Sequence, residues 1–212
     1  MIKLTAKDIA NKHHIYRINL INSCSGYKSA NLIGTKSDDG FENVAVFSSV
    51  THFGSNPPLL GFVLRPTTVL RNTYKNLKET GFYTINHIHE SIISEAHHTS
   101  AKYPGDVSEF TKTCLESEYK SDFYAPFVNN CPIQIAMKYE EEYPIKANDT
   151  ILVIGSVQEI YIKDELLSND GFIDLAKGKV VTINGLDGYA ATNLIDRFEY
   201  QRPKKDALKE SS

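Results

Sequence analysis

Two apolar runs of strand length, separated by a turn, constrain the fold more than any other feature of this 212-residue chain. Residues 43–49 form the first run and residues 59–64 form the second, and Asn56-Pro57-Pro58 lies between them. Asparagine and proline favour turns, and continuous apolar runs of this length between turn residues are typical of buried β-strands. The region therefore predicts two strands joined by a turn.

Further runs of strand length are spread along the rest of the chain. They cover residues 18–21, 29–35, 81–86, 132–141, 151–162 and 180–183. Asp38-Asp39-Gly40 is a strong hairpin signal between the runs at 29–35 and 43–49. Gly155 lies inside a run, where it suits a β-bulge or the corner of a barrel.

Two segments are expected to be helical. Residues 69–80 carry apolar side chains at helical spacing, with Thr68 as the candidate N-cap and Gly81 after the last turn. Residues 91–100 form the second segment. Strands and helices do not alternate along the chain, which excludes a doubly wound parallel sheet. The pattern favours a mainly β fold, a closed antiparallel barrel with a few peripheral helices.

One domain of ordinary size accounts for most of the chain. We expect this domain to span residues 18–202. Residues 1–17 are polar and are expected to form a mobile arm or a short helix. Residues 203–212 are a charged tail with little to bury, which we expect to be disordered.

Composition excludes several classes of function and location. The chain holds 23 Lys and Arg against 26 Asp and Glu, so its overall charge gives no indication of a nucleic-acid-binding protein. No run approaches the roughly 20 apolar residues of a membrane-spanning helix, and the N-terminus lacks the apolar stretch of a signal peptide. The three cysteines are widely spaced, which argues against a disulfide framework and a zinc site. We therefore expect a cytoplasmic protein with no nucleic acid or membrane partner.

Hydroxyl groups and cations gather where the two apolar runs end. These side chains are Ser48, Ser49 and Thr51 after the first run, and Arg65, Thr67, Thr68 and Arg71 after the second. Small donors beside a guanidinium suit a phosphate ester, and the start of a helix adds free N–H groups. The plainer interpretation is an ordinary helix start with solvated arginines. The first interpretation predicts a site for a phosphorylated cofactor.

The same region carries a family resemblance. The pattern Asn-x-Ala-x-x-Ser-Ser at 43–49, a Pro-Pro-Leu, and a strand leading into an Arg/Thr-rich helix start resemble the flavin reductase-like proteins with the FMN-binding split β-barrel. Further matches are the strand at 81–86, the small-residue–Lys–aromatic turn at 100–103, and Gly185, Gly188 and Tyr189. The similarity covers roughly residues 18–202. One departure is that residues 28–35 stand where the family often has Pro-Arg-Pro.

This resemblance implies an antiparallel Greek-key split β-barrel that pairs as a homodimer, with FMN in a groove between the protomers. At matching positions it implies cofactor contacts along the flavin ring and ribityl chain from Ser48, Ser49 and Thr51. It implies phosphate contacts from Arg65, Thr67, Thr68, Arg71 and Lys102. Asn43 also matches the family. The plainer alternatives are a turn residue for Asn43 and a solvated side chain for Lys102. No residue is identified as catalytic.

The histidines invite a metal interpretation. His87 and His89 would share one side of a strand, but His97 and His98 are neighbours on a helix and point about 100° apart. A metal site needs three or four converging ligands, so we expect none. His87 is instead a candidate for lining the flavin pocket.

Taken with these observations, the resemblance implies an FMN-binding oxidoreductase, an NADH- or NADPH-dependent flavin reductase. The alternative is a flavoredoxin-like electron carrier that holds FMN and exchanges electrons with a redox protein. A third possibility is a protein that handles pyridoxal or pyridoxine phosphate. The chain has no Gly-x-Gly-x-x-Gly after a strand and hence no Rossmann unit. In the resembling family the nicotinamide stacks on the flavin directly.

The polar stretch at 100–121 is longer than a minimal barrel connection. Loops of this length are often functional lids. Tyr103, Phe110 and Tyr119 could cover an exposed flavin face. Alternatively, Phe110 and Tyr119 could only anchor to the barrel a loop that has no role in the site.

Overall fold

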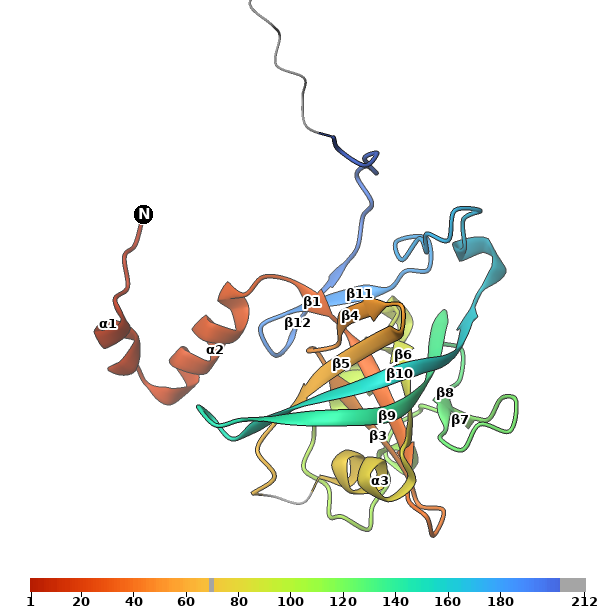
Figure 1. Ribbon diagram of the computed structural model, residues 1–212. Helices are drawn as coiled ribbons and strands as arrows, with labels where there is room; N and C mark the ends of the chain where they lie inside the picture. The colour runs from red at the N-terminus through yellow and green to blue at the C-terminus, as the bar shows by residue number, and fades with distance from the viewer. Residues whose placement is uncertain (69–70, 203–212) are drawn as a thin grey trace, which may run out of the picture.

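The computed structural model describes residues 1–68 and 71–202, and its centre is a seven-stranded antiparallel sheet (Figure 1). The sheet has the order β3-β2-β6-β9-β10-β5-β4. Its strands are β2 (Asn31–Lys36), β3 (Glu42–Phe47), β4 (Thr51–Ser55), β5 (Pro58–Leu64), β6 (Phe82–His87), β9 (Ile133–Ile145) and β10 (Thr150–Ile162). The two edge strands, β3 and β4, follow each other in the chain. The mainly β, antiparallel architecture predicted from the sequence is confirmed.

Two small sheets and several helices accompany the large sheet. β1 (Lys28–Ser29), β11 (Val181–Asn184) and β12 (Gly188–Ala191) form one small sheet, and β7 (Ser117–Glu118) and β8 (Phe127–Val128) form the other. The α-helices are α1 (Ala6–Ala10), α2 (His14–Cys24), α3 (Asn72–Thr80) and α4 (Ile93–His98). The 3₁₀ turns are η1 (Glu90–Ile92), η2 (Glu109–Thr111) and η3 (Asp164–Leu166). None of these described helices is long and apolar enough to cross a bilayer.

Gly155 allows the two longest strands to bend as a pair. The register between β9 and β10 shifts at Ile154/Gly155, which is the bulge that the sequence predicts. A Cβ at position 155 would lie 2.3 Å from the Tyr83 hydroxyl and 2.7 Å from the Lys138 carbonyl oxygen. Only glycine therefore fits where the bent strand passes over Tyr83.

Apolar side chains pack on both faces of β2 and β3. Inside the curved sheet, the rings of Phe47, Phe62 and Tyr83 form two edge-to-face contacts with centroids 5.1 and 5.5 Å apart. Outside it, a second cluster packs against α4 and β11 and includes Leu32, Val44, Ile88 and Val181. Because β3 is packed on both faces, its position relative to α4 is well defined.

The N-terminal arm is helical, and the strand expected at residues 18–21 is wrong. Thr5 and Asp8 form a capping box at the start of α1, and α2 continues to Cys24. Residues 14–24 contain neither Gly nor Pro, so a helix can continue through the apolar run. Neither helix buries a residue, and both project from the barrel in Figure 1.

Helix α3 begins later than the sequence suggests. The N-cap is Arg71, in an extended conformation, so the expected N-cap at Thr68 is wrong. Gly81 ends the helix in the left-handed region, with φ 75°, as predicted. The charged tail at 203–212 and residues 69–70 lie outside the described part of the chain.

Candidate functional site

The exposed edge of β3 presents backbone donors in a row. Among the described strands β3 pairs only with β2, so every second N–H points away from the sheet. The N–H of Val44 donates to the Glu109 carboxylate, and that of Val46 donates to Thr99 Oγ1 over 2.9 Å. The next donor in the row belongs to Ser48, and among the described residues it has no acceptor. The edge is thus covered by η2 and α4 up to Val46 and is open at Ser48.

Ser49 joins the end of β3 to β5. Its hydroxyl accepts from the Val63 N–H over 3.0 Å and donates to the Val63 carbonyl over 3.2 Å. The Ser49 hydroxyl therefore has a structural role, because it holds the end of β3 against β5, two residues before Arg65. The hydroxyls of Ser48 and Thr51 form no hydrogen bond with other described residues, and Thr51 is exposed at the start of β4.

The cationic part of the predicted site follows β5. Arg65, Thr67 and Thr68 are exposed, whereas Arg71 is partly buried at the start of α3. Within the part of the chain that the structure describes, the buried Arg71 Nε has no hydrogen-bond partner. No side chain of the described residues caps α3, so within this part of the chain its first N–H groups are also available. A buried guanidinium N–H beside an uncapped helix start fits an anionic group.

Hydrogen bonds bring the segment after α4 to the same place. Thr99 is 4% exposed and joins α4 to β3 through Val46. Six residues further on, the Gly105 carbonyl accepts from Asn72 Nδ2 over 3.1 Å at the start of α3. Lys102 lies between these two anchors and is exposed. The segment therefore bridges the open edge of β3 and the first turn of α3.

Asn43 of β3 is bonded to the start of α3 and to η2. It is 2% exposed, and in the amide orientation that satisfies both atoms it donates to Glu109 over 3.0 Å and accepts from Thr73 Oγ1 over 3.1 Å. Burial raises the pKa of Glu109. Asn43 thus connects β3, α3 and η2, and the structure gives its side chain a supporting position.

The stretch at 100–121 is attached to the barrel at several points. Phe110 packs against the outer apolar cluster, and the Tyr119 hydroxyl donates to Glu42 over 2.6 Å. Lys36 Nζ lies 4.5 Å from the centre of the Tyr119 ring. The Tyr103 hydroxyl bonds His98 Nε2 over 2.5 Å. These contacts favour the plainer interpretation of Phe110 and Tyr119 as anchors.

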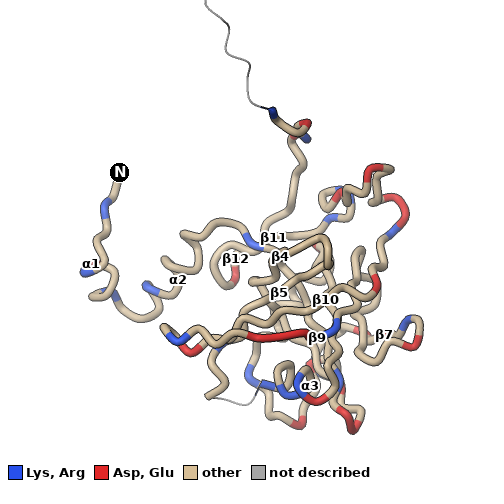
Figure 2. Tube along the Cα trace, viewed as in Figure 1, with Lys and Arg blue, Asp and Glu red and all other residues tan. Residues whose placement is uncertain are grey.

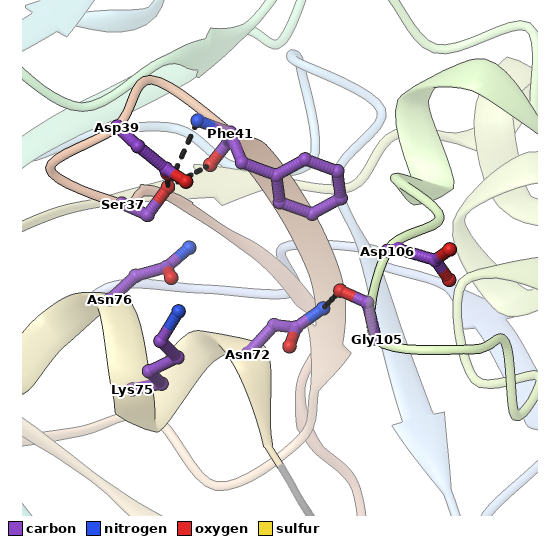
Figure 3. Close-up of a pocket in the computed structure, with 8 residues that line it drawn as sticks. All are labelled: Ser37, Asp39, Phe41, Asn72, Lys75, Asn76, Gly105 and Asp106. Atoms are coloured by element: carbon purple, nitrogen blue, oxygen red, sulfur yellow. Dashed lines mark hydrogen bonds between the residues drawn. The ribbon is translucent and has the colours of Figure 1, made fainter.

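A pocket of about 250 Å³ lies beside the first turns of α3 (Figure 3). Its lining includes Asp39, Asn72, Lys75 and Asp106. Two carboxylates against one ammonium make it a poor receptor for a phosphate. A second pocket of about 320 Å³ lies between α4 and β12 and includes His97 and Tyr189. Neither pocket contains any of the nine residues predicted to bind the cofactor.

His87 lies at the end of β6, next to Asn31 of β2 in the register. Burial lowers the pKa of His87 to about 4. Both amide atoms of Asn31 are buried without a partner among the described residues.

Across residues 1–68 and 71–202, no three His, Cys, Asp or Glu side chains are grouped as metal ligands would be. His97 instead contacts Tyr189, with ring centroids 5.7 Å apart.

Sequence reasoning missed the residues that hold the site together. Thr99, Asn72 and Thr73 were not candidates, although each bonds a segment of the site to another. A small polar residue that ends a helix was the only available signal for Thr99. Strand β4 was also missed, because all but one of its residues are exposed and it has no apolar alternation.

Comparison with known proteins identifies the fold. A family model described as the flavin reductase like domain matches residues 26–182. A split barrel domain protein from Shewanella frigidimarina NCIMB 400, classed with the flavin reductases, is 42% identical, with a TM-score of 0.92 and coverage of 95% of this chain and 100% of that one.

Two more distant structures share the architecture. Nitrilotriacetate monooxygenase component B from Bacillus cereus is 20% identical, with a TM-score of 0.80 and coverage of 94% of this chain and 98% of that one. Flavoredoxin of Desulfovibrio vulgaris (Miyazaki F) is 21% identical, with a TM-score of 0.68 and coverage of 86% and 93%. The fold is a split β-barrel, and the chain belongs to the flavin reductase-like family.

Proposed function

We propose that the protein is an FMN-binding oxidoreductase that takes electrons from NADH or NADPH and works as a homodimer. The proposal is carried by two kinds of open donor, one at each of the two elements that the segment at 99–105 links by hydrogen bonds. The open N–H of Ser48 lies at the edge of β3, and the buried Nε of Arg71 lies at the uncapped start of α3. Hydrogen bonds from Ser49, Thr99 and Asn72 hold these segments together.

Each part of the proposed site has its own task. Arg65, Thr67, Thr68, Arg71 and Lys102 would hold the phosphate. Ser48, Ser49 and Thr51 would lie along the ring and ribityl chain, with the backbone N–H groups facing the polar edge of the ring. Bound FMN would supply the hydride chemistry. The protein's donors are fixed in place by the fold, so they can favour the reduced, more negative ring without rearrangement.

Asn43 has a supporting task in this proposal. Its amide holds α3 and η2 against β3. Through these contacts it sets the distance between the phosphate end and the ring end of the site. The two pockets beside α3 and between α4 and β12 do not include the site. A second copy would supply the missing wall.

Purification followed by reduction tests the proposal. The protein should be yellow and should release FMN when it is denatured. Mixing with NADH or NADPH in a stopped-flow instrument should bleach the flavin absorbance rapidly. A colourless protein that retains no FMN after incubation with it and gel filtration would contradict the proposal.

An electron carrier is the second candidate function, and the similarity to flavoredoxin over 86% of the chain favours it. A carrier would hold FMN in the same site. Both nicotinamides would then bleach the flavin slowly, whereas a ferredoxin-like donor would reduce it rapidly. The same stopped-flow experiment therefore separates the two candidates.

A further inference from the structure

The N-terminal arm, defined here as residues 1–24, exposes apolar side chains on more than one side of α2. Ile15, Tyr16 and Ile21 are 55%, 49% and 48% exposed. Successive residues of an α-helix point about 100° apart, so these three side chains cannot share one face. A helix that is apolar on several sides is normally buried on several sides. Nothing in the described part of the same chain buries α2.

The arm nevertheless leaves the barrel in a fixed direction. Lys28 Nζ donates to the Asn22 carbonyl over 2.7 Å and to the Gly185 carbonyl over 3.2 Å. These bonds join the end of α2 to the β11–β12 hairpin. Figure 1 shows both helices projecting from the barrel on a short connection to β1. An element that is already ordered loses less conformational entropy when it binds.

The charge of the arm is opposite to that of the whole chain. Residues 1–24 contain four cations and a single carboxylate, Asp8, in a chain whose formal net charge is −3. The cations are Lys3, Lys7, Lys12 and Arg17. Lys12 and Arg17 flank the exposed Ile15 and Tyr16, so apolar and basic groups alternate along the arm.

The β9–β10 hairpin carries an exposed strip of acidic and apolar side chains between Lys138 and Lys146, which we call the acidic edge and define as Glu140, Glu141, Tyr143 and Ile145. Figure 2 shows the acidic run along β9. Glu140 and Glu141 are exposed, and their hydrogen bonds go to Ser156 and Tyr143. Neither forms an ion pair within the described residues. Tyr143 and Ile145 are 51% and 37% exposed.

We infer that the arm of one chain docks on the acidic edge of a second copy, and that two copies exchange their arms reciprocally. The inference rests on the homodimer of the proposed function. A second copy is favoured because both complementary surfaces belong to one chain. In the described residues no hydrogen bond or ion pair joins the arm to its own acidic edge. Reciprocal exchange in a two-fold dimer makes each contact twice.

Cross-linking between labelled copies tests the contact. Full-length ¹⁴N and ¹⁵N chains are mixed, allowed to exchange, and treated with a carbodiimide that joins amines to adjacent carboxylates. The expected product links Lys7 or Lys12 of one isotope to Glu140 or Glu141 of the other. Links confined to single chains, or no link to the acidic edge, would overturn the inference.

Variants test whether the contact stabilises the dimer. Sedimentation should show at least a tenfold higher dissociation constant for Ile15→Glu combined with Ile21→Glu. Arg17→Glu and Glu141→Lys should each weaken the dimer, and their combination should restore it. Leu167→Glu is the control, because Leu167 is equally exposed, at 50%, but follows η3.

FMN affinity is measured in parallel, so that failure of the arm exchange can be distinguished from failure of the proposed function. A dimer that persists unchanged in all arm variants would overturn the arm exchange alone. A wild-type chain that is monomeric would overturn the arm exchange and also the dimeric part of the proposed function. Restoration of the dimer by the charge swap, with FMN still bound, would support both.

Discussion

Arg71 lies in an environment that is unfavourable for a guanidinium without an anionic partner. It is the N-cap residue of α3, it is partly buried, and its Nε has no acceptor among the described residues. A buried donor left without a partner costs about 1–3 kcal/mol. An anionic ligand at this position would offset that cost. The phosphate assignment therefore depends on this residue more than on the exposed Arg65.

Replacing Arg71 should lower the affinity for FMN more than the affinity for riboflavin, which lacks the phosphate. A charge-assisted hydrogen bond contributes about 1.5–3 kcal/mol, so Arg71→Ala should weaken FMN roughly 10- to 100-fold and riboflavin little. Fluorescence-quenching titrations measure both affinities. Arg197→Ala is the matched control, because Arg197 is exposed and pairs with Asp170 over 2.6 Å. An equal loss for both ligands would place the phosphate elsewhere.

His87 is expected to make the fold sensitive to acid. Burial lowers its pKa from 6.5 to about 4. Between pH 6.5 and 4, His87 is therefore protonated in the unfolded chain and neutral in the folded chain. Stability should therefore be unaffected by His87 above pH 7 and should fall as the pH drops from 6.5 to 4. At about 1.4 kcal/mol per pKa unit, the loss reaches up to about 3 kcal/mol.

Urea unfolding of the wild type and of His87→Gln at several pH values checks this expectation. Glutamine keeps a polar side chain and does not titrate, so the variant should lose stability less steeply between pH 6.5 and 4. The slope is the readout, because the substitution itself can shift stability at every pH. Parallel slopes for the two proteins would mean that His87 titrates normally in the folded state.

At the scale of elements, the bend of β9 and β10 depends on Gly155 passing over Tyr83. Gly155→Ala should destabilise the protein by about 1–3 kcal/mol, because the new methyl group would meet the Tyr83 hydroxyl at 2.3 Å and the Lys138 carbonyl oxygen at 2.7 Å. Adding Tyr83→Phe should recover part of the loss, since it removes one of the two clashes. Thermal unfolding of both variants measures the difference.

Tyr83→Phe alone is the control for that pair. The Tyr83 hydroxyl is buried without a partner among the described residues, so its removal should be neutral or slightly stabilising. Additive effects of the two substitutions would show that Gly155 is required for backbone reasons only.

Elements with local signals could be predicted, and those that depend on distant contacts could not. The hairpin at Asp38-Asp39-Gly40, the bulge at Gly155 and the helix end at Gly81 each follow from residues within a few positions. The start of α3 does not, because Arg71 replaces Thr68 as the N-cap. The apolar run at 18–21 was interpreted as a strand, although no neighbouring strand exists to pair with it among the described residues.

At the scale of the whole molecule, the family resemblance predicted the fold. The geometry of the candidate site could not be predicted, because it depends on contacts between segments that are distant in the sequence. The sequence indicated hydroxyls after one strand and cations after the next. It did not indicate that Ser49 would bond β5, or that Thr99 and Asn72 would bring residues 99–105 between β3 and α3. These are long-range hydrogen bonds between polar residues, which leave no periodic pattern in the sequence.

The most direct test of the two-part site is a titration of the ¹⁵N-labelled protein, with bound flavin removed, followed by amide chemical shifts. FMN should shift two groups of amides, those of residues 48–51 at the end of β3 and those of residues 71–73 at the start of α3. Riboflavin should shift the first group and leave the second unchanged, because it has no phosphate. The amides of Asp39 and Asp187, which line the two pockets, serve as controls. Shifts confined to those pockets, or identical shifts for both ligands, would contradict the account.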